Sequence, residues 1–141
     1  MRRRSTAIAA ALSVLALGSP LFTGCSDFAA NIRFRSAGLN FDRGNYQGAI
    51  DDYTKAIEIN PKYDLAYSNR GVARVKLGDT QGAIADYNKA IEINPQDAAH
   101  YYKRGTAKEL VGDLEGACAD WEEASSLLGT EDATWGEMYQ C

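Results

Sequence analysis

Apolar residues recur along this chain at helical spacing, in segments separated by short polar turns. Ala49, Ile50, Tyr53, Ala56 and Ile57 follow the pattern i, i+1, i+4, i+7 and i+8. That spacing places them on one stripe of an amphipathic helix. The same pattern along the chain predicts helices at residues 28–43, 46–59, 64–77, 80–93, 98–111 and 114–128.

One ten-residue segment of this pattern occurs twice. Residues 52–61 and 86–95 differ only at Thr54 and Asn88, and the offset of 34 residues continues into a third copy. The shared registers are small (Ala37, Gly71, Gly105), glycine (Gly44, Gly78, Gly112), alanine (Ala49, Ala83, Ala117), aromatic (Tyr53, Tyr87, Trp121) and again alanine (Ala56, Ala90, Ala124). A fixed period of this size is typical of a stacked array, in which each unit buries its apolar side against its neighbours.

Turn residues mark the ends of the predicted helices. Each register glycine is followed by a residue that caps helices well, namely Asn45, Asp79 and Asp113. Pro61 and Pro95 end the second helix of the first two copies, because the residue before a proline avoids the helical region. The third copy has Gly129 in that register, where we expect the array to stop.

These registers, in this order and at this spacing, resemble the tetratricopeptide repeat (TPR) family. The resemblance covers residues 30–131, as repeats at 30–63, 64–97 and 98–131. It implies an all-α fold, a right-handed α-solenoid of three helix-turn-helix repeats. We expect residues 132–141 to form a C-terminal capping segment with a short helix, because repeat arrays need their apolar ends covered.

Residues 1–24 have the organisation of an export signal. Arg2, Arg3 and Arg4 precede an apolar run at residues 7–17, which is shorter than the roughly 20 residues of a membrane span. Residues 21–25 are similar to the lipobox of bacterial lipoproteins, although Phe22 departs from it. This resemblance implies lipidation of Cys25, followed by a short linker at residues 25–29.

Two alternatives to the lipoprotein remain open at the N-terminus. The apolar run could be a retained anchor, or the chain could be secreted after cleavage near Ala16-Leu17-Gly18. All three alternatives place the protein in the cell envelope or outside the cell. Exported chains meet an oxidising compartment, so we predict a disulfide between Cys118 and Cys141.

Charge narrows the class of partner. The formal net charge of the 141 residues is −4, and residues 1–24 carry three arginines and no acid, so the rest of the chain is at −7. An acidic domain without a basic run does not suit nucleic acid, whose phosphates need clustered lysine and arginine. We therefore expect no nucleic-acid partner. The expected partners are another protein and, through lipidated Cys25 or an uncleaved N-terminal segment, a membrane.

The sequence contains no recognisable catalytic or cofactor-binding constellation. His100 is the only histidine, and no HExxH, CxxC or GxxxxGK[ST] motif occurs. A lone histidine near the start of a helix is more often a packing residue than a catalyst, so we expect His100 to be partly exposed packing. We expect no enzyme activity, no cofactor and no metal.

In the TPR family, the first helices of successive repeats line a concave groove that holds a peptide or a partner helix. Carrying over the groove registers gives Phe34, Phe41, Leu65, Asn69, Val72, Tyr102, Lys103 and Thr106. Asn69 is the leading candidate because its amide both donates and accepts hydrogen bonds, and we expect it and Lys103 to face solvent. Packing against the N-terminal segment or against the lipid-proximal surface is an open alternative for Phe34 and Phe41.

TPR domains that clamp chaperone C-termini place asparagines and basic residues around a terminal carboxylate. Asn69 and Lys103 match that set, but Phe34, Gly38 and Ala99 occupy its other registers, so we expect no such clamp. The resemblance implies a non-catalytic interaction scaffold of the bacterial cell envelope. Self-association remains an alternative, as does an accessory role for an envelope protease or peptidoglycan hydrolase.

Overall fold

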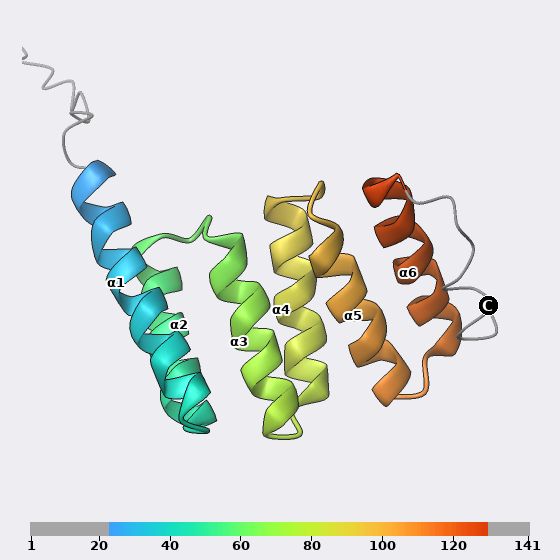
Figure 1. The fold of residues 1–141 in the computed structure, drawn as a ribbon, viewed down its shortest axis with the longest axis horizontal. Coiled ribbons are helices and arrows are strands. Elements are labelled where there is room, and N and C mark those ends of the chain that lie inside the picture. Colours follow the sequence, from blue (N-terminus) through green and yellow to red (C-terminus); the bar gives the residue numbers. More distant parts are fainter. Residues whose placement is uncertain (1–22, 130–141) are drawn as a thin grey trace, which may run out of the picture.

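The computed structural model describes residues 23–129, which form an all-α solenoid of six helices (Figure 1). The helices are α1 (Thr23–Asp42), α2 (Tyr46–Ile59), α3 (Asp64–Lys76), α4 (Thr80–Ile93), α5 (Ala98–Leu110) and α6 (Leu114–Leu128). The closest contacts are within the pairs α1–α2, α3–α4 and α5–α6, and each pair packs on the next. The predicted fold class is confirmed, and α2 to α6 end within one residue of their predicted bounds.

The first helix departs from the prediction. α1 begins at Thr23 instead of residue 28, so the expected linker at residues 25–29 lies inside it. The sequence contains no glycine or proline between Cys25 and Ala37, so nothing there opposes continuation of the helix. The predicted capping segment at residues 132–141 lies outside the described residues. Within residues 23–129, none of the helices combines the length and apolar composition needed to cross a bilayer.

The turns inside the repeats form as predicted. Gly44, Gly78 and Gly112 have φ of 76°, 84° and 83°, a left-handed conformation that glycine adopts without steric cost. The next residue then caps the following helix: Asn45, Asp79 and Asp113 accept hydrogen bonds from the backbone N–H groups of Gly48, Gly82 and Gly116. These bonds satisfy donors that each helix start would otherwise leave without partners. Gly129, with φ of 65°, ends α6 in the same left-handed region.

The core is made of alanines and one large aromatic residue per repeat. Tyr53, Tyr87 and Trp121 are almost completely buried. A Cβ atom placed on Gly71 would lie 2.7 Å from the Tyr87 ring, and one on Gly105 would lie 2.6 Å from Nε1 of Trp121. The small register therefore exists because the aromatic ring occupies the space where a side chain would stand.

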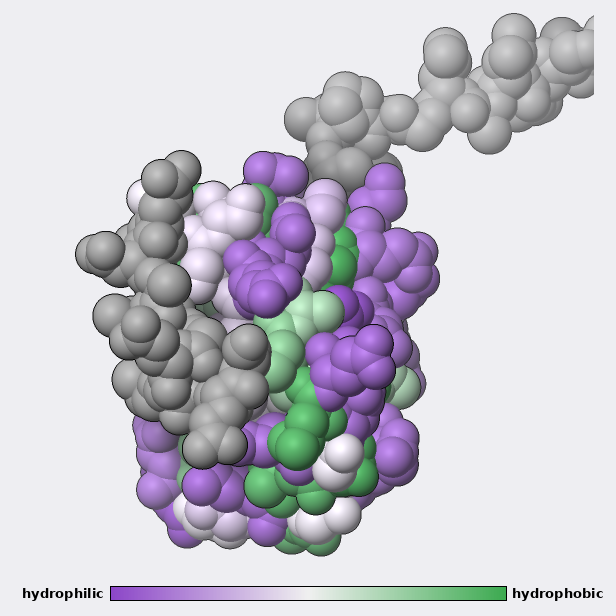
Figure 2. All heavy atoms as spheres, turned by 90° about the vertical axis from the view of Figure 1, so that its right-hand side faces the viewer, coloured by the Kyte–Doolittle hydropathy of each residue, from purple (hydrophilic) through white to green (hydrophobic). Residues whose placement is uncertain are grey.

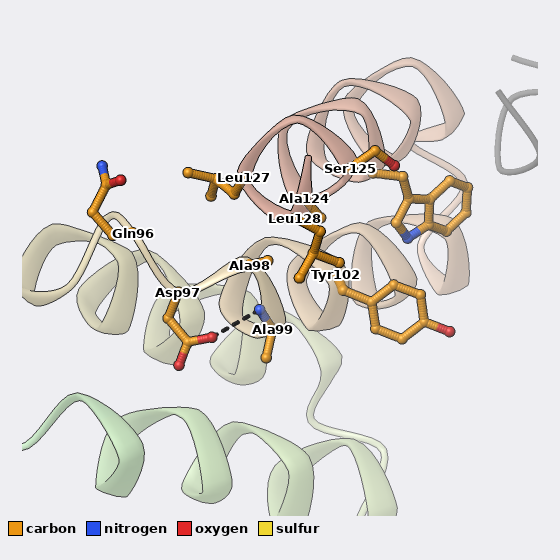
Figure 3. A pocket seen from close by; sticks show the side chains of 10 residues that line it. Gln96, Asp97, Ala98, Ala99, Tyr102, Ala124, Ser125, Leu127 and Leu128 are labelled. Atoms are coloured by element: carbon orange, nitrogen blue, oxygen red, sulfur yellow. Dashed lines mark hydrogen bonds between the residues drawn. The ribbon is translucent and has the colours of Figure 1, made fainter. Parts of the chain in front are cut away.

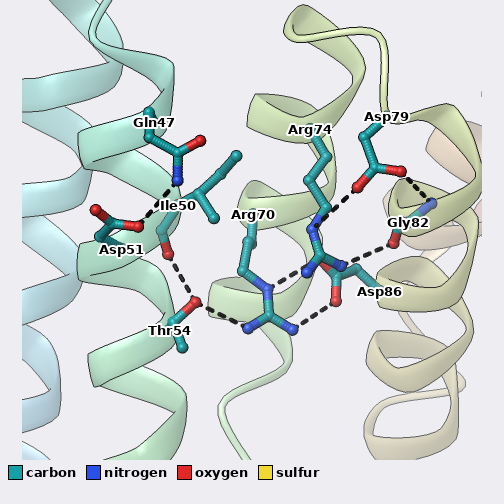
Figure 4. Close-up of polar contacts among 9 residues, drawn as sticks. All are labelled: Gln47, Ile50, Asp51, Thr54, Arg70, Arg74, Asp79, Gly82 and Asp86. Atoms are coloured by element: carbon teal, nitrogen blue, oxygen red, sulfur yellow. Dashed lines mark hydrogen bonds and ion pairs between the residues drawn. The ribbon is translucent and has the colours of Figure 1, made fainter.

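A buried ionic cluster joins the two helices of the second repeat (Figure 4). Asp86 of α4 pairs with two guanidinium groups of α3, that of Arg70 at 2.7 Å and that of Arg74 at 2.9 Å. Arg70 also donates to Thr54 Oγ1 of α2 at 3.0 Å. The cluster therefore links the second repeat internally and ties it to the first.

The third repeat contains the same arrangement, and the first repeat differs in its closest partners. Asp120 pairs with Arg104 and Lys108, while Arg104 donates to Asn88 Oδ1 of the preceding repeat at 2.8 Å. In the first repeat, Asp52 accepts hydrogen bonds from neutral Ser36 and Asn40, at 2.7 and 3.0 Å, while the cations of Arg33 and Lys55 lie farther away, both at 3.7 Å. Thr54 and Asn88, the two positions at which the ten-residue copies differ, are thus both acceptors for the next repeat's arginine.

Candidate functional site: a groove along the first helices

Two neighbouring cavities follow the first helices of the repeats, and we refer to them together as the groove. The first cavity measures about 280 Å³ and lies between α1 and α3, with Tyr53 of α2 in its lining. Its lining residues are Gly38, Phe41, Asp42, Tyr53, Asn69 and Val72. It therefore combines an apolar floor with one carboxylate and one amide.

The second cavity measures about 230 Å³ and lies between α3 and α5. Its lining residues are Val72, Val75, Lys76, Tyr87, Tyr102, Lys103, Thr106, Ala107 and Leu110. Val72 lines both cavities, so they adjoin along α3. The lining is mostly apolar, with two lysines at this end of the groove and Asp42 at the other.

Six of the eight predicted binding residues line the groove. They are Phe41, Asn69, Val72, Tyr102, Lys103 and Thr106. Phe34 and Leu65 line neither cavity. The Phe34 ring stacks on Tyr63 at 4.9 Å and lies 5.5 Å from Tyr53, so it packs against α2 and the turn before α3. Leu65 is 43% exposed on α3.

The polar groups of the groove are less exposed than the sequence predicted. Asn69 is half-buried and hydrogen-bonds Tyr53, and Lys103 is half-buried with its Nζ donating to Ser68 Oγ at 2.9 Å. Burial raises the pKa of the Tyr53 hydroxyl, and the hydrogen bond from Asn69 acts in the opposite direction. Burial also lowers the pKa of the Lys103 ammonium, which the nearby Asp97 carboxylate opposes. Asn69 and Lys103 are only partly exposed because they lie between neighbouring helices, not on an isolated one.

A third cavity, of about 590 Å³, lies between α5 and α6 at the C-terminal end of the array (Figure 3). Its lining residues are Gln96, Asp97, Ala98, Ala99, Tyr102, Trp121, Ala124, Ser125, Leu127 and Leu128. Figure 2 views the molecule from this end, where hydrophobic surface lies among hydrophilic residues. Tyr102 also lines the second cavity, so its side chain borders both.

His100 belongs to a polar joint between the second and third repeats. It is fully buried, not partly exposed as predicted, and its Nε2 lies 3.2 Å from Asp64 Oδ2 and 3.6 Å from Asp97 Oδ2. Asn94 donates to the same oxygen of Asp64 at 2.9 Å. Burial by itself would raise the pKa of Asp64, but the hydrogen bonds from Asn94 and His100 outweigh it and lower that pKa.

These three residues are the group in the described part of the chain that could hold a metal ion. One ligand atom from each of Asp64, Asp97 and His100 lies within 4.8 Å of the others. Asp64 is already hydrogen-bonded by Asn94 and His100, and Asp97 caps α5 through Ala99 N–H. The contacts therefore account for the cluster as a structural joint.

Two contributors to the groove are not predicted by the sequence. Tyr53 and Tyr87 lie on second helices, where the repeat pattern predicts packing alone, yet each also lines a cavity. The partners of Asp86 and Asp120 are likewise not predicted. The signal was present, because Arg70 and Arg104 precede these aspartates by the same 16 residues.

Models of the tetratricopeptide repeat match residues 39–78, 65–97 and 86–119. Between them they span more than half of the chain. Among curated proteins, none matches this sequence.

Several solved TPR domains have the same fold. The TPR domain of Arabidopsis OM64 is 25% identical, with a TM-score of 0.74, over 82% of this chain and 93% of that one. The first TPR of Spaghetti (RPAP3), bound to the HSP90 peptide SRMEEVD, is 27% identical, with a TM-score of 0.75, over 81% and 90%. The TPR2B domain of yeast Sti1, in a complex with pHsp70, is 26% identical, with a TM-score of 0.72, over 80% and 91%.

Proposed function

Because the chain belongs to the tetratricopeptide repeat family, we propose that it is a non-catalytic protein-interaction scaffold of the bacterial cell envelope. The observation that carries this proposal is the groove, in which two adjoining, mostly apolar cavities share Val72. Apolar cavities with a few placed polar groups suit a ligand that offers both side chains and backbone amides. An extended peptide or a partner helix has that chemistry.

The charges of the groove indicate the direction in which such a ligand would be oriented along it. Lys76 and Lys103 line the cavity between α3 and α5, whereas Asp42 lines the cavity between α1 and α3. Asn69 lies in the first cavity, with an amide suited to a peptide backbone. A ligand with an acidic group near the lysines and a basic group near Asp42 would match this distribution.

Peptide-bound solved structures support protein binding in general, but the residues of this chain favour a ligand other than a chaperone tail. Two of the similar structures contain an HSP90 peptide or pHsp70. The registers that would complete a carboxylate clamp here hold Phe34, Gly38 and Ala99. Phe34 is packed against Tyr53 and Tyr63, and the other two side chains offer no charge or hydrogen bond. The proposed ligand therefore binds through internal side chains and not through a terminal acidic motif.

The groove is tested by the double substitution Asn69→Ala and Lys103→Ala. We expect loss of the partner that wild-type protein captures by crosslinking from envelope membranes, because both polar anchors are removed. Each residue also makes a hydrogen bond, so the double variant should lose about 1 kcal/mol of stability per bond, and circular dichroism must show that it stays folded.

A second variant tests the groove without removing a hydrogen bond that stabilises the fold. The Gly38→Leu side chain would enter the first cavity without breaking a hydrogen bond, since nothing lies within 4 Å of a Cβ placed there. The control is Leu65→Ala, an exposed α3 side chain outside both cavities. Capture that survives in both groove variants would contradict the groove assignment.

We also propose that lipidation of Cys25 holds this scaffold at a membrane. The support is the lipobox-like segment at residues 21–25 behind the apolar run. An acyl chain contributes about 0.8 kcal/mol per buried methylene, so two or three chains anchor a small domain.

Intact-mass measurement of the mature protein checks this anchor. We expect a chain that begins at Cys25 and carries the mass of acyl groups, and a Cys25→Ser variant that is released from membranes or remains unprocessed. A mature chain with unmodified Cys25 would rule out the lipoprotein.

A further inference from the structure

The outer face of α1 carries an apolar stripe that nothing in residues 23–129 covers. Phe28, Ile32 and Leu39 are 68%, 51% and 57% exposed, and their spacing places them on one side of the helix. Exposed Arg35 falls on the same side by the same count. Exposed Arg43 follows the last residue of α1, and its N–H still donates to Leu39 O at 3.3 Å, so it continues the line of the helix. We call these five residues the α1 outer face. α1 is the first helix of the described residues, and no other described helix packs on this side (Figure 1).

The side chains of this face do not suit another repeat. In α3 the registers of Ile32 and Leu39 hold Ala66 and Ala73, which are completely buried against the repeat before them. Isoleucine and leucine in those registers would overpack a joint of that spacing. A fluid lipid surface can accommodate these larger side chains, because it does not require a complementary shape.

The charges of this face point to an anionic surface. Arg70, Arg74 and Arg104 are held in ion pairs with Asp86 and Asp120. Among the described residues, by contrast, neither Arg35 nor Arg43 has a carboxylate within ion-pair distance. Exposed arginines beside an apolar stripe are typical of helices that lie in the interface of an anionic membrane.

We propose that the α1 outer face lies flat on an anionic phospholipid surface. Phe28 and Leu39 are about 16 Å apart along the helix axis, so the stripe contacts the surface over its length instead of inserting at one end. Cys25 lies three residues before Phe28 on the same helix, so an acyl anchor there would be about one helical turn from the α1 outer face along the chain. The inference adds an orientation to the proposed membrane scaffold: the third repeat is the part farthest from the bilayer.

Quenching of an introduced tryptophan by brominated lipids tests this orientation in the full-length chain. Phe28→Trp places the reporter on the α1 outer face, and Leu65→Trp is the matched control on exposed α3. The native Trp121 and Trp135 supply a background that is measured in the unsubstituted chain. The vesicles contain equal parts of phosphatidylglycerol and phosphatidylcholine, or phosphatidylcholine alone, each brominated.

We expect strong added quenching for Phe28→Trp in the anionic vesicles and none for Leu65→Trp. Adding Arg35→Glu and Arg43→Glu to the Phe28→Trp chain should reduce its quenching to that of the control. Equal quenching at both positions would overturn the proposal, as would equal quenching of Phe28→Trp in both vesicle types. A lipid-free dimer in which the Phe28→Trp reporter is shielded would overturn it in favour of a second copy.

The quenching test does not depend on the proposed lipid anchor at Cys25 or on the proposed groove. The measurement is repeated with Cys25→Ser, which carries no acyl chain. Persistent quenching there supports the α1 outer face even if Cys25 proves unmodified, and loss of partner capture by groove variants leaves it unchanged. Quenching that disappears with Cys25→Ser overturns an independent role for this face.

Discussion

Replacing Asp86 with alanine is expected to lower the free energy of unfolding by about 3–5 kcal/mol, the range measured when one partner of a buried ion pair is removed. The Asp86 side chain is 4% exposed and neutralises Arg70 and Arg74, which are themselves only 13% and 26% exposed. Without the carboxylate, two guanidinium groups remain at the α3–α4 interface with little access to water. Urea denaturation followed by circular dichroism measures the loss.

The first repeat supplies the matched control for this prediction. Asp52 occupies the same register, but its closest partners are the neutral side chains of Ser36 and Asn40. Arg33 and Lys55 lie 3.7 Å from its carboxylate, and their side chains are 48% and 52% exposed to water. Asp52→Ala therefore leaves no buried charge without a partner, and we expect a loss of about 1 kcal/mol. Asp51→Ala, on the exposed side of α2, should change stability by less than about 0.5 kcal/mol. Equal losses for Asp86→Ala and Asp52→Ala would show that the charge of the partners is irrelevant.

Reduction of a Cys118–Cys141 disulfide is expected to cost about 3 kcal/mol, the chain-entropy value for a loop of this size. Cys118 is half-buried on α6, on the same side as Trp121 and Ser125, which line the third cavity, between α5 and α6. Gly129 turns the chain at the end of α6, so a tail running back along this cavity would return to the level of Cys118. Cys141 lies outside the described residues, so the pairing remains a prediction.

Thiol counting on the denatured, exported protein checks the disulfide. With Cys25 excluded, we expect no reactive thiol before reduction and two afterwards. Cys118→Ser and Cys141→Ser should each melt at the temperature of the reduced wild type, and reductant should not destabilise either variant further. A wild-type melting temperature that ignores reductant would contradict the bond.

Local rules explain the features that the sequence predicted correctly. Asn45, Asp79 and Asp113 cap helices because a side-chain oxygen reaches an N–H three residues ahead, whatever lies elsewhere in the molecule. The alternation of glycine turn and Asn-Pro turn, repeated at 34 residues, likewise needs only neighbours along the chain. The groove registers could be carried over for the same reason, since every repeat has the same internal geometry.

Contacts between repeats explain the features that it did not predict. Phe34 lies in a groove register but packs on Tyr63, a residue 29 positions further along the chain. His100 is buried where it contacts Asp64 of the preceding repeat. Lys103 is half-buried where its Nζ donates to Ser68 of the same preceding repeat. No pattern within one helix contains these partners.

The sequence by itself determined the helices, their caps, the repeat and the family, because each depends on short-range spacing or on agreement among three copies. Only the tertiary structure decided the exposure and partners of individual side chains: the buried guanidinium partners of Asp86, the neutral closest partners of Asp52, and the exposed apolar side of α1. The physical reason is that burial and charge pairing depend on which helix packs alongside, and helices of identical pattern acquire different environments at the end and in the middle of an array.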